Sequence, residues 1–161
     1  MELEIANYLN KVSEGRLSSE SKLEIRGMLR EVTEIESIGD SCYNLARTIN
    51  RKRSGGNDFT EKQYEHIHQM MQLTDDALAQ MIAIVEDDYH VVDVNKTFNL
   101  ENEINNYRAQ LKNQNVVDVN NKEYDYQMGV HYMDLIGECE KLADYVVNVV
   151  EARTNVKEKK A

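Results

Sequence analysis

Two segments of the chain, 104 residues apart, repeat one pattern of oxygen-bearing side chains. Each reads E-x-x-x-D-x-x-x-N, with Glu36, Asp40 and Asn44 in the first copy and Glu140, Asp144 and Asn148 in the second. On a helix, a spacing of four places all three side chains on one face. Carboxylate and amide oxygens suit hard ions such as magnesium, manganese or iron. The alternative is that each stripe is an ordinary solvated face.

The residues around the two stripes also align, which indicates an internal duplication. Adding 104 to the first copy pairs Val32 with Ile136, Ile35 with Cys139, Ile38 with Leu142, Gly39 with Ala143, Cys42 with Val146, and Leu45 with Val149. Small residues beside the aspartates would let a neighbouring helix approach closely. We therefore expect Asp40 and Asp144 to be partly shielded from water, where a carboxylate needs a cation or a hydrogen-bond partner.

Five helices are predicted to carry these stripes. Apolar spacing predicts helices over about 2–13, 18–52 and 60–88, a fourth that begins near Asn95 or Thr97, and a fifth that carries residues 128–150. Capping boxes are predicted at residues 60–63 and 120–123, with turns over 113–121. No segment shows sustained strand alternation, so the predicted fold is all-α.

The second and fifth helices have long apolar faces. The predicted packing face of the second consists of Ile25, Met28, Leu29, Val32, Ile35, Gly39, Cys42, Ala46 and Ile49. The predicted face of the fifth consists of Met128, Tyr132, Leu135, Ile136, Cys139, Leu142, Val146, Val149 and Val150. Steps of three and four are typical of a seam between helices. Cys42 and Cys139 are expected to be reduced core residues.

Composition excludes several classes of function. The 161 residues carry a net charge of −10, which argues against nucleic acid and anionic membrane surfaces as partners. No run of 18 apolar residues is present, so this segment is not expected to insert into a membrane. No phosphate-binding glycine loop, nucleophile elbow or Cys–His pair is present, and we expect no enzymatic activity. The alternative from that class is a metal-dependent hydrolase that uses the motif carboxylates.

The two motif segments resemble those of the PhoU family. Residues 35–40 (IESIGD) and 139–144 (CEKLAD) are similar to the family's LERIGDH and LERIADH segments. Residues 100–108 resemble the acidic middle helix of the family's second bundle. Residues 5–9 and 26–30 are closer to one branch, the cytoplasmic PhoU-like C-terminal domain of bacterial sodium/phosphate cotransporter II-related proteins.

The resemblance implies an all-α, PhoU-like antiparallel helical bundle. Residues 1–56 would form an incomplete first bundle and residues 57–161 a complete three-helix bundle, each with one motif helix, together in one compact domain. In some family members the motif carboxylates bind iron or zinc clusters. Carried over, that implies a transition metal (iron, zinc or manganese) held by Glu36, Asp40, Glu140 and Asp144, with Asn44 and Asn148 as neighbours on the same faces.

The chain departs from the family pattern at three points. Ser41 and Tyr145 stand where a histidine often follows the motif aspartate, and Asn105 stands where an aspartate is common. These two departures each remove candidate metal ligands, and the third concerns the first bundle. Before residue 18 there is room for one short helix where the family has two long ones, so we expect a membrane part of the polypeptide upstream of Met1.

The function implied is that of a cytoplasmic regulatory or accessory domain of a sodium-dependent phosphate cotransporter-related membrane protein. Its place would be the cytoplasmic face of the bacterial inner membrane. Its expected partners are the transporter domain of the same polypeptide and a second copy of the chain. The alternative is a free-standing PhoU-like regulator of a phosphate ABC transporter and a sensor kinase.

Overall fold

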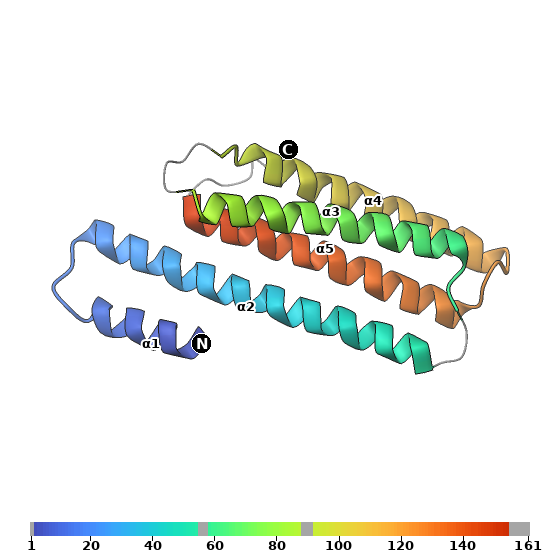
Figure 1. Ribbon diagram of the computed structural model, residues 1–161, viewed down its shortest axis with the longest axis horizontal. Coiled ribbons are helices and arrows are strands. Elements are labelled where there is room, and N and C mark those ends of the chain that lie inside the picture. The colour runs from blue at the N-terminus through green and yellow to red at the C-terminus, as the bar shows by residue number, and fades with distance from the viewer. Residues whose placement is uncertain (1, 55–57, 88–91, 155–161) are drawn as a thin grey trace.

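Five helices run back and forth along one long axis (Figure 1). The computed structural model describes residues 2–54, 58–87 and 92–154. The helices are α1 (Glu2–Ser13), α2 (Ser19–Ser54), α3 (Glu61–Val85), α4 (Asn95–Asn120) and α5 (Tyr126–Thr154). No strand occurs in these residues, so the all-α prediction is confirmed. None of the described helices combines the length and apolar character needed to cross a membrane.

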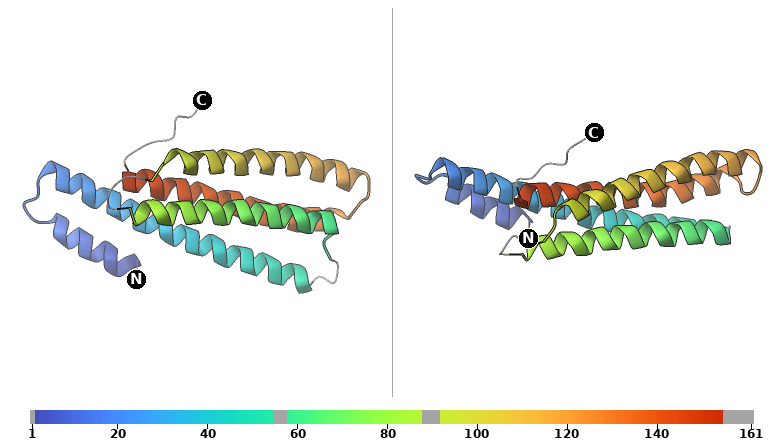
Figure 2. Two further views of the ribbon diagram at one scale, coloured as in Figure 1. Left: turned by 45° about the horizontal axis from the view of Figure 1, so that its top comes forward. Right: turned by 90° about the horizontal axis from the view of Figure 1, so that it is seen from above.

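Helix α5 is the element on which most of the others pack. It contacts α2, α3 and α4, whereas α1 packs on α2 alone. Helices α3, α4 and α5 form a three-helix bundle, and α2 lies along α5 and runs antiparallel to it (Figures 1 and 2). Every apolar residue predicted to face the core from α5 is buried. Helix α5 is covered by three neighbours, and therefore apolar spacing locates its buried surface correctly.

The predicted division of the chain at residues 56 and 57 falls outside the described residues, and it stays a prediction. The later segment contributes the three-helix bundle. The earlier segment contributes α2 and the short α1, and at one end these two extend beyond the other helices (Figure 1).

The start of α3 is capped as predicted. The Gln63 backbone N–H donates to Thr60 Oγ1 at 3.2 Å, and the Thr60 N–H donates to Gln63 Oε1 at 3.0 Å. These two bonds satisfy donors that a helix N-terminus otherwise leaves unpaired.

The second predicted capping box, at residues 120–123, is wrong, and so are the predicted turns over 113–121. Helix α4 continues to Asn120, and the Gln114 amide donates to Asp118 Oδ1, one turn further on, at 2.6 Å. Pairs four residues apart support a helix even where asparagines favour turns. Helix α5 starts instead with Asp125, whose Oδ1 accepts from the Met128 backbone N–H at 2.7 Å.

The predicted packing face of α2 is wrong over most of its length. Of its nine residues only Ile25 is buried, and Ile35 remains 45% exposed. Residues outside the predicted face lie toward α5 instead, among them Ile38, 9% exposed, and Ser41, 1% exposed. Cys42, expected in the core, is exposed, whereas Cys139 is buried as predicted.

Polar and small residues explain why α2 packs on a face that apolar spacing does not reveal. A Cβ atom added at Gly27 would lie 3.3 Å from the Ala152 carbonyl oxygen, so the helices are close there. Arg30 and Glu34 lie on the following turns of α2, and both hydrogen-bond to Asn148 of α5. An interface made this way leaves the apolar stripe of α2 on another side of the helix.

A cluster around Lys52 joins the end of α2 to the start of α3. The Lys52 ammonium donates to Asp58 Oδ1 and, at 2.9 Å, to the Tyr64 hydroxyl, and it lies 4.6 Å from the Phe59 ring centroid. The hydrogen bond from Lys52, together with that from Tyr64, lowers the pKa of Asp58 to about 2. The cluster therefore fixes where α3 begins relative to α2.

Candidate functional site

The two motif helices, α2 and α5, are direct neighbours. The Asn148 amide donates to Glu34 Oε2 at 3.1 Å, and the Arg30 guanidinium donates to Asn148 Oδ1 at 3.1 Å and to Glu151 Oε2 at 3.0 Å. These bonds define the antiparallel register of the two helices. Asn148, predicted as a neighbour of metal ligands, is therefore a bridge between the motif helices.

This register gives the sequence duplication a structural meaning. It places Gly39 at the level of Ala143, and the duplication pairs the same two residues. Equivalent residues of the two motif helices therefore lie at matching levels on either side of this point, as a local two-fold axis requires. The repeated pattern corresponds to a local two-fold axis between α2 and α5.

The two ends of this helix pair differ in their hydrogen bonds. The duplicates of Glu34 and Asn148 are Glu138 and Asn44, so an equivalent bridge at the other end would join these two residues. The Asn44 side chain, however, makes no hydrogen bond within the described residues. One carboxylate oxygen of Glu138 is buried without a hydrogen-bond partner. The residue equivalent to Arg30 is Asp134, so the second end lacks the arginine that organises the first.

The first pair of predicted metal ligands lies on the outside of α2. Glu36 and Asp40 are both exposed, since Ile38 and Ser41 occupy the side that faces α5. The expected shielding of Asp40 is wrong, because Gly39 is not at a helix contact. No atom lies within 4 Å of a Cβ added there.

The second pair lies on α5 in different surroundings. Glu140 is half-buried, and its Oε2 lies 3.6 Å from Arg108 Nε of α4. Burial raises the pKa of Glu140, Arg108 lowers it, and Asp144 raises it further. Asp144 is exposed although Ala143 beside it is buried, so its expected shielding is also wrong.

The four nominated carboxylates do not assemble a metal site on their own. Over residues 2–54, 58–87 and 92–154, no three His, Cys, Asp or Glu side chains are grouped so that they could hold a metal ion. Each helix offers two carboxylates one turn apart, which falls short of the ligand number that hard cations take. Metal binding by this chain stays a prediction.

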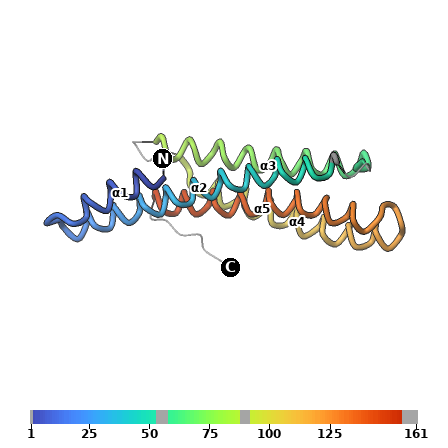
Figure 3. The backbone as a smooth tube through the Cα atoms, turned by 90° about the horizontal axis from the view of Figure 1, so that it is seen from below, coloured from blue at the N-terminus to red at the C-terminus, as the bar shows by residue number. Residues whose placement is uncertain are grey.

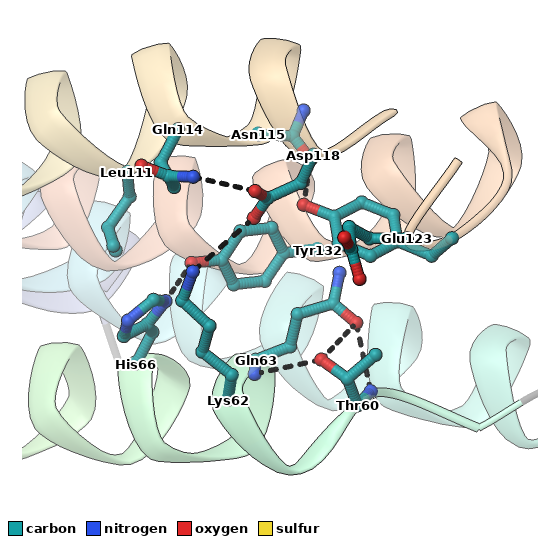
Figure 4. Close-up of a pocket in the computed structure, with 11 residues that line it drawn as sticks. Thr60, Lys62, Gln63, His66, Leu111, Gln114, Asn115, Asp118, Glu123 and Tyr132 are labelled. Atoms are coloured by element: carbon teal, nitrogen blue, oxygen red, sulfur yellow. Dashed lines mark hydrogen bonds and ion pairs between the residues drawn. The ribbon is translucent and has the colours of Figure 1, made fainter. Parts of the chain in front are cut away.

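A polar cavity that the sequence did not indicate lies between α3, α4 and α5. It has a volume of about 310 Å³ (Figure 4). The Tyr132 hydroxyl lies 2.9 Å from His66 Nδ1, and Lys62 Nζ lies 3.7 Å from Asp118 Oδ2. Burial lowers the pKa of His66 and raises that of Tyr132. Both side chains are therefore neutral near pH 7.

The charge of this cavity makes it unsuitable for an anion such as phosphate. Of the lining side chains that carry a charge near pH 7, Lys62 is basic while Asp118 and Glu123 are acidic. The buried amide nitrogen of Gln63 has no hydrogen-bond partner within the described residues. The cavity suits water or a small uncharged polar molecule. Its residues come from three helices and from the segments just before α3 and between α4 and α5, and they share no sequence pattern, so only the packing of the helices brings them together.

Comparison with known families identifies the fold. The PhoU domain matches residues 67–152, more than half of the chain, and the chain belongs to the PhoU family. The match begins in α3 and ends in α5, so it covers almost the whole three-helix bundle and one of the two motif helices. Neither a curated protein nor a solved structure matched the chain. The family is regulatory rather than catalytic and acts in phosphate transport.

Proposed function

We propose that the chain is the cytoplasmic regulatory or accessory domain of a sodium-dependent phosphate cotransporter-related membrane protein. The observation that carries the proposal is the PhoU match over the α3–α5 bundle. The particular branch is supported by the resemblance of residues 5–9 and 26–30, which lie in α1 and α2, outside the matched region.

The mechanism proposed is docking of helix faces onto the transporter. The exposed carboxylates Glu36 and Asp40 on α2 and Asp144 on α5 give the domain an acidic outer surface, consistent with its net charge of −10. Such a surface favours basic partner segments and repels acidic ones. A transition metal bound at either stripe would need further ligands from a docked partner or from water. It would therefore link metal binding to docking.

The complete gene and the sodium dependence of phosphate uptake test this proposal together. We expect hydrophobic spans upstream of Met1 and phosphate uptake that requires sodium and changes when this domain is removed. A gene without such spans, whose product co-purifies with a phosphate ABC transporter and a sensor kinase, would instead establish the free-standing regulator.

A further inference from the structure

An uncovered apolar stripe runs along the second half of α2. This outer stripe consists of Ile35, Gly39, Cys42, Ala46 and Ile49, in alternating steps of four and three residues. That spacing is typical of a seam between two packed helices. Ile35 is 45% and Ile49 37% exposed, and the three residues between them are exposed as well. The stripe has the pattern of a packing surface, but among the described residues no helix lies on it from Ile35 to Ala46, and Ile49 borders an apolar groove that Ile67 and Met71 of α3 also line.

The duplication indicates that this face is built for packing. The residues of α5 equivalent to Ile35, Gly39 and Cys42 are all buried in the three-helix bundle, at most 1% exposed; they are Cys139, Ala143 and Val146. The repeated face is therefore covered by other helices on α5 but exposed on α2.

Helix α1 covers the neighbouring part of the same face. Leu9 of α1 and Ile25 of α2 are both buried, and α1 lies alongside only the first part of α2 (Figures 1 and 3). The outer stripe begins beyond the part of α2 that α1 covers. The established α1–α2 contact therefore continues directly into the uncovered stripe.

We propose that a second copy of the chain covers the outer stripe, with the two α2 helices antiparallel and crossing at Cys42. In this register Ile35 lies opposite the partner's Ile49, and Cys42 lies opposite the partner's Cys42. Gly39 lies next to the partner's Ala46, where two small residues allow the helices to approach closely. One register thus matches large residues with large ones and small residues with small ones.

Charge favours the antiparallel direction. Glu36 and Arg47 are exposed and flank the stripe on the same side. In the antiparallel register Glu36 lies opposite the partner's Arg47, and the pair occurs twice because of the symmetry. A parallel pair would place Glu36 and the partner's Arg47 at different levels and on opposite sides of the seam, so this ion pair could not form. The inference does not rest on the proposed function, because it uses only the outer stripe and its flanks.

Sedimentation equilibrium and thiol cross-linking test the proposal on the complete 161-residue chain. We expect a concentration-dependent dimer that a short bis-maleimide links through Cys42. Cys139 is an internal control, because its thiol is buried and burial raises its pKa to about 11. Cross-linking should disappear in Cys42→Ser and persist in Cys139→Ser.

Substitutions test the register. Ile35→Glu should weaken dimerisation at least tenfold without changing the helical content measured by circular dichroism. Val116→Glu is the matched control, since Val116 is 56% exposed on α4. Glu36→Arg and Arg47→Glu should each weaken the dimer, and the double variant should restore it, because the exchanged charges again face each other.

Three results would overturn the proposal. The first is a monomer at all concentrations with no cross-link. The second is a dimer that Ile35→Glu and the charge exchange leave unchanged. The third is a longer polypeptide from the same gene that stays monomeric and protects Cys42 from maleimide, since a helix of that polypeptide would then cover the stripe.

Discussion

Replacing Asn148 by alanine should destabilise the chain, whereas the same change at its duplicate, Asn44, should not. Asn148 donates to Glu34 and accepts from Arg30, both at 3.1 Å, and Asn44 makes no side-chain hydrogen bond within the described residues. The two positions are both half-buried and both helical. They are therefore a matched pair that differs mainly in hydrogen bonding.

The size of the effect follows from the two bonds of Asn148. Hydrogen bonds to charged partners contribute about 1.5–3 kcal/mol each, and partial exposure reduces this to about 1 kcal/mol each. Alanine regains about 0.6 kcal/mol of helix propensity at either position. Asn148→Ala should thus cost about 1–2 kcal/mol, and Asn44→Ala should stabilise the chain by about 0.5 kcal/mol.

Urea and thermal unfolding followed by circular dichroism measure this difference. For a chain of this size, 1–2 kcal/mol corresponds to a drop in Tm of about 2–8 °C for Asn148→Ala. The measurements should use dilute protein, so that dimerisation of the chain does not contribute to its measured stability. Equal effects of the two substitutions would refute the reasoning, because they would mean that the bridge to Glu34 and Arg30 does not stabilise the α2–α5 contact.

Four further predictions address the core, the exposed stripe of α2, pH and metal. Ile136→Ala removes a fully buried side chain and should cost about 2–5 kcal/mol in urea unfolding. Ile35→Ala at the exposed stripe should cost the dilute monomer less than about 1 kcal/mol. The pKa of Asp58 is lowered, so its ion pair with Lys52 stabilises the fold above the ordinary aspartate pKa and is lost as pH falls toward about 2. Asp58→Asn should therefore lower the Tm at pH 7, with the difference from the parent chain vanishing at low pH. Elemental analysis of purified protein should show only partial transition-metal content, and stoichiometric metal that survives Asp40→Ala plus Asp144→Ala would mean that other residues are the ligands.

Sequence patterns located the core of α5 but not the contact face of α2. On α5, residues such as Ile136 and Val146 are buried because neighbouring helices cover most of its circumference. On α2, the contact with α5 is made largely by residues that an apolar pattern ignores, such as Arg30, Glu34 and Ser41. Apolar periodicity finds apolar surfaces, whether or not the chain itself covers them.

Sequence patterns also predicted only part of the candidate site. The repeated motif identified α2 and α5 as related helices, and their local two-fold arrangement agrees with that. It did not reveal that Asn148 pairs with Glu34, because the partner of a polar side chain depends on the register between helices. The polar cavity at His66 and Tyr132 was out of reach for the same reason, since three helices contribute to it.

Phosphate uptake by cells is the measurement that tests the regulatory role most directly. Cells that carry the complete gene should be compared with cells in which only the segment encoding residues 1–161 is deleted, at limiting and at abundant external phosphate. A regulatory domain predicts that the deletion alters uptake, or its response to external phosphate, while the remaining polypeptide is still made. Uptake that is unchanged at both phosphate levels would contradict a regulatory role in phosphate transport.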